Sequence, residues 1–347
     1  MLTQNITNIK KFTIKALLLS AITIFTLSSC TEVKRGEYVK GSGTICCDDG
    51  FRNIMEEEIE VFEFSYPDAS IIPFYVSEKE ALDSLMADAT QQIVVSRELT
   101  KEEISFLKKK RKRVARQNCI AVDAVALIVN KDNPVGALSL EDIKGIMTGK
   151  IARWDQLAGN DTTRIKLVFD NAGSSTVSYM RQKFLDNKGT ISDHTYSFAQ
   201  KNNAQVFDVV KKDPRALGII SVSWLGDNLS GAKKVPLDQR VEDYKNETDT
   251  LATNLTTEVN IIKISNPTQE NDFSPVSYAP YQAYIYSGEY PLVRKIYMIS
   301  TASNSTVSHS FYTFVTGYVG QKIISKTGIL PFHLNPRVVN LVDNSKK

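Results

Sequence analysis

The sequence predicts an α/β fold of two domains, each with a mostly parallel sheet flanked by helices. Short runs rich in β-branched residues alternate along the chain with segments of helical period, as in strands joined by crossover helices. The length of 347 residues favours two domains over one. A composition of 42% apolar and 23% charged residues excludes a disordered chain, a collagen-like repeat and a coiled coil.

Each predicted element rests on a local signal. Apolar residues recur at helical spacing in residues 51–62, and the Tyr66-Pro67 dipeptide ends that helix. Capping sequences predict two further helices, which begin after Thr100 and Ser139. Residues 120–129 are too rich in β-branched side chains for a good helix and are predicted to form a strand. The other predicted strands are 71–75, 93–95, 165–169, 217–222, 259–264 and 284–300, and the other predicted helices are 77–88, 176–185, 203–212 and 307–324.

The first 29 residues are typical of a secretory leader. Three lysines precede an apolar run over residues 16–27, which is shorter than the roughly 20 residues that a membrane span needs. The run ends in Leu27-Ser28-Ser29-Cys30, which resembles the bacterial lipobox, where the cysteine sulfur takes a diacylglycerol. We therefore expect a signal peptide over 1–29, a lipid on Cys30, a tether over 30–40 and an extracytoplasmic location. The alternative is a plain signal peptide with an accidental cysteine.

Charge and cysteine content narrow the function further. Of the 42 basic residues three lie in the leader, which leaves 39 against 39 acidic residues and excludes a generally basic protein that coats nucleic acid. Cys46, Cys47 and Cys119 show no zinc spacing. Two alternatives stay open for them: one of the vicinal pair bridges Cys119, or all three are small buried hydrophobic residues.

Three places in the sequence favour oxyanion binding, because the start of a helix offers unpaired N–H groups and a positive dipole end. The first is Asp48 to Phe51, where Gly50 precedes a helix, and the second is Ser77, at the start of the next helix. The third is the segment 170–176, in which Gly173 is followed by Ser174, Ser175 and Thr176. For each place the alternative is helix capping alone.

Two stretches then resemble the phosphate-binding proteins of phosphate ABC transporters. Residues 120–134, IAVDAVALIVNKDNP, are similar to that family's crossover segment, and residues 138–154, LSLEDIKGIMTGKIARW, are similar to the stretch that follows it. Gly173-Ser174-Ser175-Thr176 stands where the family has its G-S-G-T phosphate loop. The similarity extends from about Gly43 to Pro331.

The resemblance implies a type II periplasmic-binding-protein fold, in which two α/β lobes clamp an anion. It implies a first lobe of residues 41–122 and 286–347 and a second lobe of residues 123–285. It carries over Ser174 and Thr176 as donors to phosphate oxygens and Ser175 as a backbone donor. It places the segment 48–51 and Ser77 on the opposite lobe. The implied protein is a monomer that hands inorganic phosphate to an ABC permease and needs no cofactor or metal.

The sequence departs from the family pattern at two positions. Asp170 replaces the arginine that stands four residues before the loop serine, and Ser96-Arg97 replaces a Ser-Asp pair. We hypothesise that Arg97 supplies the missing guanidinium from the opposite lobe. A carboxylate of Asp48, Asp49 or Asp170 would accept a hydrogen bond from the proton that phosphate carries and sulfate lacks. The alternative for Asp170 is a structural salt bridge with a lysine.

Two other functions compete with phosphate transport. An enzyme with Ser174 as nucleophile is disfavoured, because G-S-S-T is not the G-x-S-x-G elbow and no H-E-x-x-H spacing occurs. A binding-protein-like sensor or adaptor, for another oxyanion or a protein partner, is compatible with the lost arginine. No P-loop or G-x-G-x-x-G sequence indicates a nucleotide.

Overall fold

The computed structural model describes residues 39–159, 161–188, 191, 196–226, 235–245, 255–265 and 276–333. The predicted signal peptide, the predicted lipidation site Cys30 and the predicted tether up to residue 38 lie outside the described residues. No helix among the described residues combines the length and the apolarity that a membrane span requires.

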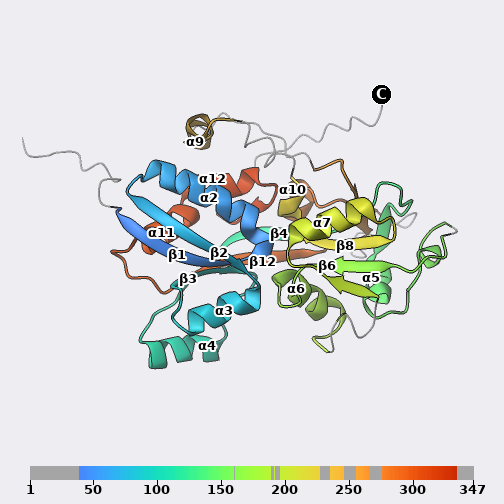
Figure 1. The fold of residues 1–347 in the computed structure, drawn as a ribbon, viewed down its shortest axis with the longest axis horizontal. Helices are drawn as coiled ribbons and strands as arrows, with labels where there is room; N and C mark the ends of the chain where they lie inside the picture. Colours follow the sequence, from blue (N-terminus) through green and yellow to red (C-terminus); the bar gives the residue numbers. More distant parts are fainter. Residues whose placement is uncertain are drawn as a thin grey trace, which may run out of the picture. The chain divides into compact units, whose positions relative to one another are not determined.

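Strands and helices alternate through the described chain (Figure 1). The strands are β1 (Gly41–Asp48), β2 (Ala69–Val76), β3 (Gln92–Val95), β4 (Arg116–Val129), β5 (Ala137–Ser139), β6 (Lys166–Phe169), β7 (Ser197–Ala199), β8 (Ala216–Ser221), β9 (Asn260–Ile261), β10 (Lys263–Ser265), β11 (Ser277–Tyr278), β12 (Val293–Ser300) and β13 (Leu330–Pro331). The α-helices are α2 (Arg52–Ser65), α3 (Glu78–Met86), α4 (Lys101–Phe106), α5 (Leu140–Met147), α6 (Ser175–Phe184), α7 (Asn203–Lys212), α9 (Leu237–Lys245), α10 (Gln282–Tyr286), α11 (Val307–Thr316) and α12 (Tyr318–Lys326). The described residues also contain the 3₁₀ helices η1 (Asp49–Phe51), η3 (Trp154–Gln156) and η5 (Val222–Trp224) and the π-helix η2 (Leu107–Arg111).

The main sheet consists of two groups of strands joined by two long ones. Its order is β2-β1-β3-β12-β4-β8-β6-β7. Strands β1, β2 and β3 pair in parallel and form the first strand group. Strands β6, β7 and β8 pair in parallel and form the second strand group. Between the groups, β12 and β4 run antiparallel to their neighbours. The α/β class of mixed, mostly parallel sheets with flanking helices is therefore confirmed.

Strand β4 belongs to both groups because it changes partner along its length (Figure 1). Residues up to Ala124 pair with β12, and residues from Val125 onward pair with β8. From Ile120 to Val129 the strand is buried except at Val122, since layers of helices and strands cover it on both faces. A single apolar cluster includes β4 residues together with Phe51, Trp154 and Phe311.

Two sequence predictions for the C-terminal part were wrong. The predicted helix 307–324 is two helices, because Gly317 takes an extended backbone and ends α11. Gly320 then lets α12 approach α11, since a Cβ there would lie 2.6 Å from the Phe314 carbonyl oxygen. The predicted strand 284–300 starts instead with residues of α10, and only β12 is a strand.

The three cysteines in the described part of the chain are free. Cys46 and Cys47 are buried in β1, and Cys119 is half-buried in β4. Burial raises the pKa of the Cys119 thiol to about 11, which keeps it protonated and unreactive near neutral pH. The interpretation of these residues as buried thiols is confirmed for the vicinal pair, and no disulfide joins Cys119 to either.

Candidate functional site: an oxyanion cradle occupied by a carboxylate

Polar side chains gather where parallel strands of the two groups end. Asp48 is the last residue of β1, and Asp170 follows directly after β6. Both are buried, at 0% and 1% exposure. The carboxyl ends of strands, where helices begin, are the usual place for a ligand in an α/β sheet. This edge is therefore the candidate site.

The N-terminal turn of α6 forms what we call the oxyanion cradle: Ser174, Ser175 and Thr176, all buried. Ser174 is the N-cap, and its hydroxyl accepts from the Val177 N–H at 3.2 Å and donates to Asp170 Oδ1. Capping therefore uses one serine and leaves the first backbone N–H of the helix, on Ser175, free to bind an anion.

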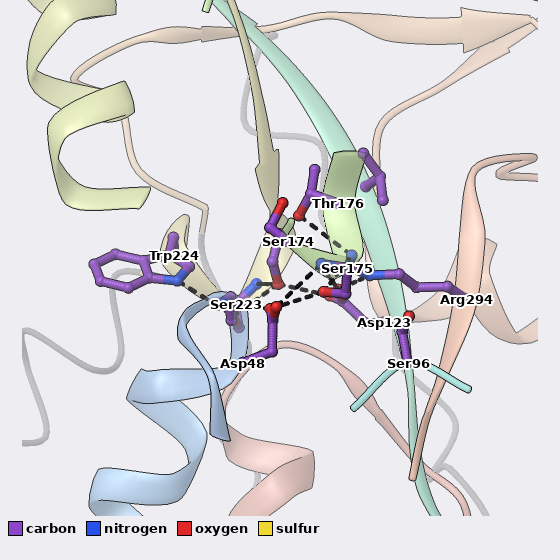
Figure 2. Close-up of polar contacts among 12 residues, drawn as sticks. Asp48, Ser96, Asp123, Ser174, Ser175, Thr176, Ser223, Trp224 and Arg294 are labelled. Atoms are coloured by element: carbon purple, nitrogen blue, oxygen red, sulfur yellow. Dashed lines mark hydrogen bonds and ion pairs between the residues drawn. The ribbon is translucent and has the colours of Figure 1, made fainter. Parts of the chain in front are cut away.

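The carboxylate of Asp48 occupies that position (Figure 2). The Ser175 N–H donates to Asp48 Oδ2 at 3.0 Å, and the Ser175 hydroxyl donates to Asp48 Oδ1 at 2.7 Å. The Gly50 N–H adds a third bond to Oδ1, at 3.0 Å. An oxygen anion thus already sits on the cradle, and it comes from the protein itself.

Arg294, on β12, supplies the guanidinium beside the cradle (Figure 2). Its Nε donates to Asp123 Oδ2 at 2.9 Å, and its Nη1 donates to the hydroxyls of Ser175 at 3.0 Å and Thr176 at 3.2 Å. The guanidinium also lies over the Phe51 ring, with the central carbon 4.9 Å from the ring centroid. Arg294 is 6% exposed, so its charge acts in a medium that screens little.

Three buried carboxylates surround this one guanidinium. Burial raises the pKa of Asp48 to about 6, and the charge of Glu78 adds to the rise while Arg294 and the bonds from Ser175 oppose it. Burial and the charge of Asp48 raise the pKa of Asp170 to about 7, against the bonds from Ser174 and Asn203. Burial also raises the pKa of Asp123, although Arg294 and Ser221 stabilise its charged form. The site therefore favours holding a proton near neutral pH.

The structure brings two further predicted residues beside the cradle. A Cβ on Gly173 would lie 3.2 Å from the Ser77 hydroxyl oxygen, and the Lys79 N–H donates to the Gly173 carbonyl at 3.3 Å. The Ser77 hydroxyl is itself occupied, since it forms a capping box with Glu80. Phe51 and Gly50 lie against Arg294 and Asp48, as described above.

Arg97 and Ser96 do not reach the cradle. Both nitrogens of the Arg97 fork bond the Glu103 carboxylate, at 2.9 and 2.8 Å, and the side chain is 40% exposed. Ser96 donates from its backbone N–H and its hydroxyl to Glu78 Oε2, at 2.6 and 2.7 Å. The guanidinium at the loop is Arg294 and not Arg97, because β12 and not the end of β3 passes beside α6.

Several site residues escaped the sequence analysis. Asp123 and Arg294 form a buried ion pair, and Ser221 supports it with a bond of 2.9 Å to Asp123. The usable signal in β4 was Asp123, the one charge within its apolar stretch Ile120–Val129, whereas in β12 Arg294 stands next to a second cation, Lys295, and is harder to single out. Ser223 and Trp224 both donate to the Gly50 carbonyl at 3.1 Å, and nothing local in the sequence marks them (Figure 2).

No metal centre is indicated in the part of the chain that the structure describes, where no three His, Cys, Asp or Glu residues are arranged to hold an ion. The arrangement is instead suited to holding an oxygen anion by N–H and O–H donors. Two strand groups with helix starts facing one another define the type II periplasmic-binding-protein fold.

Comparisons with known proteins place the chain in a family. A family model described as a PBP superfamily domain matches residues 31–318, and the chain belongs to this family. The phosphate-binding protein PstS of Borreliella burgdorferi is 24% identical over 246 residues, which are 68% of this chain and 71% of the relative. The phosphate-binding protein PstS of Bacillus subtilis is 25% identical over 201 residues, which are 58% of this chain and 64% of the relative.

Solved structures show the same fold. A phosphate ABC transporter substrate-binding protein with bound phosphate from Clostridium perfringens is similar with a TM-score of 0.63 at 23% identity, over 84% of this chain and 99% of that one. An ABC-type phosphate transport receptor from Vibrio cholerae is similar with a TM-score of 0.57 at 20% identity, over 84% of this chain and 100% of that one. The resemblance inferred from the sequence is confirmed.

Proposed function

We propose that this protein is a lipid-anchored extracytoplasmic solute-binding protein that binds inorganic phosphate and delivers it to an ABC permease. The relatives named as phosphate-binding proteins support this proposal. In the proposed molecule, a monomer, residues 41–122 and 286–347 form one lobe and residues 123–285 form the other. It binds its ligand without catalysis.

The observation that carries the proposal is the convergence of α6 and Arg294. The Ser175 N–H, three hydroxyls and a buried guanidinium present donors to one small volume. Tetrahedral phosphate has four oxygens that accept such bonds, and bonds to a charged partner are about twice as strong as neutral ones. Asp170, whose pKa is raised to about 7, is mostly ionised at pH 7.5 and would accept a hydrogen bond from the protonated oxygen of phosphate.

Titration calorimetry tests the proposal. Phosphate-free protein, purified from membranes in detergent, is titrated with phosphate, sulfate and molybdate at pH 7.5. We expect a one-to-one heat with phosphate and an affinity for sulfate at least about tenfold weaker, because unprotonated sulfate meets Asp170 with no shared hydrogen. Equal affinities for phosphate and sulfate would contradict the role given to Asp170.

A second candidate is a binding-protein-like sensor or adaptor that is not a transporter subunit. It is favoured by one observation: the Ser175 donors are engaged by Asp48 and the Ser174 hydroxyl by Asp170. A protein of this kind would contact a protein partner with its folded domain and would not bind an oxyanion in the cradle. Absence of heat with all three oxyanions would favour this candidate over the receptor.

The lipid anchor is tested by Cys30→Ala. We expect the variant to lose membrane association and the diacylglycerol mass, since stable attachment needs more than one acyl chain and no other anchor is proposed. Cell fractionation and intact-mass spectrometry make the measurement. The matched control is Cys119→Ser, which is expected to stay in the membrane fraction. Retention of the Cys30 variant in that fraction would contradict the anchor.

A further inference from the structure

The strongest unexplained feature is the position of Asp48, since three N–H or O–H groups bond its carboxylate as they would bond a ligand. We propose that Asp48 is a built-in occupant of the oxyanion cradle, which an external oxyanion must displace in order to bind. This inference rests on the proposed function for the identity of the external oxyanion, phosphate. It concerns how access to the site is regulated.

The donor count makes the two occupants mutually exclusive. The Ser175 N–H and the Ser175 hydroxyl each carry one hydrogen, and both hydrogens point to Asp48. The Ser175 hydroxyl oxygen also accepts from Arg294 Nη1, so its hydrogen is fixed toward the carboxylate. A phosphate oxygen that bonds to Ser175 must therefore replace an oxygen of Asp48.

Arg294 also has one nitrogen, Nη2, that can still donate a hydrogen bond. Its Nη2 lies 2.9 Å from Asp123 Oδ2 but makes no hydrogen bond within the described residues, although the side chain is 3% exposed. A Cβ on Gly50 would lie 3.5 Å from this Nη2 and 2.8 Å from Asp48 Oδ1, so Nη2 is close to the side of Gly50 where Asp48 lies. A buried N–H that makes no hydrogen bond is costly even within an ion pair, and an oxyanion seated beside Gly50 would accept one from Nη2.

The charges around Asp48 explain why an oxyanion must displace its carboxylate and cannot simply bind beside it. Asp48 faces Arg294, Glu78 and Asp170, so the only opposite charge among these neighbours is already shared with Asp123. A phosphate with one or two further negative charges would meet net repulsion while the Asp48 carboxylate stays in place. Neutralising Asp48 removes both the competitor and one of the repelling charges.

The same contact joins the two strand groups without any ligand. Asp48 ends β1 and Ser175 begins α6, so the pair bridges the first group to the helix that follows β6. The Gly50 carbonyl, bonded by Ser223 and Trp224, lies in the same bridge. The protein's own carboxylate thus holds the groups together as a bound anion would.

Asp48→Asn tests the inference, with Glu78→Gln as the matched control. Both changes remove one buried negative charge with little change in size, but Glu78 bonds Ser96 and does not touch the cradle. We expect Asp48→Asn to raise the phosphate affinity at pH 8 by at least about tenfold, and Glu78→Gln to raise it less than about threefold. A phosphate affinity in Asp48→Asn that is unchanged or weaker would overturn the inference, because the carboxylate would then be neutral or a ligand.

A second measurement needs no phosphate binding. Asp48→Ala removes both acceptor oxygens, and we expect the emission of Trp224 to move to longer wavelength in the ligand-free protein as its bond to Gly50 loosens. The only other tryptophan, Trp154, is 1% exposed and bonds the Arg215 carbonyl. If no variant binds phosphate, the emission of Trp224 distinguishes the two claims. A shift to longer wavelength in Asp48→Ala supports Asp48 as the occupant of the oxyanion cradle and rejects phosphate as the ligand. An unchanged emission spectrum overturns the role of Asp48 as well.

Discussion

Replacing Arg294 by glutamine is expected to weaken phosphate binding strongly and to lower the free energy of unfolding by about 3–5 kcal/mol. The loss of stability follows because Asp123 is fully buried and, once the guanidinium is gone, keeps the neutral donors Ser221 and Ala124 N–H but no opposite charge from Arg294. The loss of affinity follows because Arg294 is the guanidinium that bonds the hydroxyls of Ser175 and Thr176. We expect at least about a hundredfold weaker binding, since bonds to charged groups contribute about 1.5–3 kcal/mol each.

Urea unfolding and calorimetry make these measurements, and Arg294→Lys serves where glutamine prevents folding. Lysine keeps the charge but lacks the planar fork by which one guanidinium bonds Asp123 and two hydroxyls, so an intermediate loss is expected. The control is Arg97→Gln, which breaks a half-exposed pair with Glu103 and should cost under about 1 kcal/mol. A phosphate affinity that falls with Arg97→Gln and survives Arg294→Gln would restore the hypothesis drawn from the sequence.

Asp170→Asn is expected to flatten the dependence of stability on pH. The pKa values of Asp170, about 7, and Asp48, about 6, both lie above the ordinary value of 3.8. A carboxyl whose pKa is raised by folding stabilises the fold while it is protonated. That contribution is complete below about pH 4 and is lost as the pH rises through 6 and 7. The variant should therefore gain stability relative to the natural protein between pH 5 and pH 8.

Urea midpoints at pH 5 and pH 8 measure this difference. Asparagine keeps an acceptor for Ser174, and a flip of the Asn203 amide would let its unpartnered Oδ1 accept from the new side chain. The control is Asp213→Asn, because the bonds from Arg215 and Lys166 lower the pKa of Asp213 to about 2. It should destabilise the protein by a similar amount at both pH values. An Asp170→Asn effect equally independent of pH would contradict the raised pKa.

Local sequence signals predicted the helix starts well. Thr100 and Ser139 form the capping boxes that their spacing indicates, and Ser174 caps α6. These contacts span only a few residues, so a short sequence window contains everything that determines them. The same is true of β4, whose β-branched composition suits a strand buried on both faces.

What the sequence could not predict depends on contacts between distant residues. Arg294 lies more than a hundred residues from Ser175 and reaches it only because β12 pairs with β4. Arg97, the arginine gained where the family pattern has an aspartate, was the reasonable substitute on sequence grounds, but its guanidinium pairs with Glu103. Gly317 was missed because the apolar period continues unbroken through it, while the backbone does not.

The exchange of partners along β4 has a mechanical consequence. Asp123 is next to the step from Ala124 to Val125, where the strand leaves β12 and joins β8. If the first and second strand groups rotate relative to each other about this step, residues close to the step move little and residues far from it move more. The Asp123–Arg294 pair would then stay nearly in place, and Asp48 on β1 could separate from Ser175 on α6 only after the two hydrogen bonds between them break.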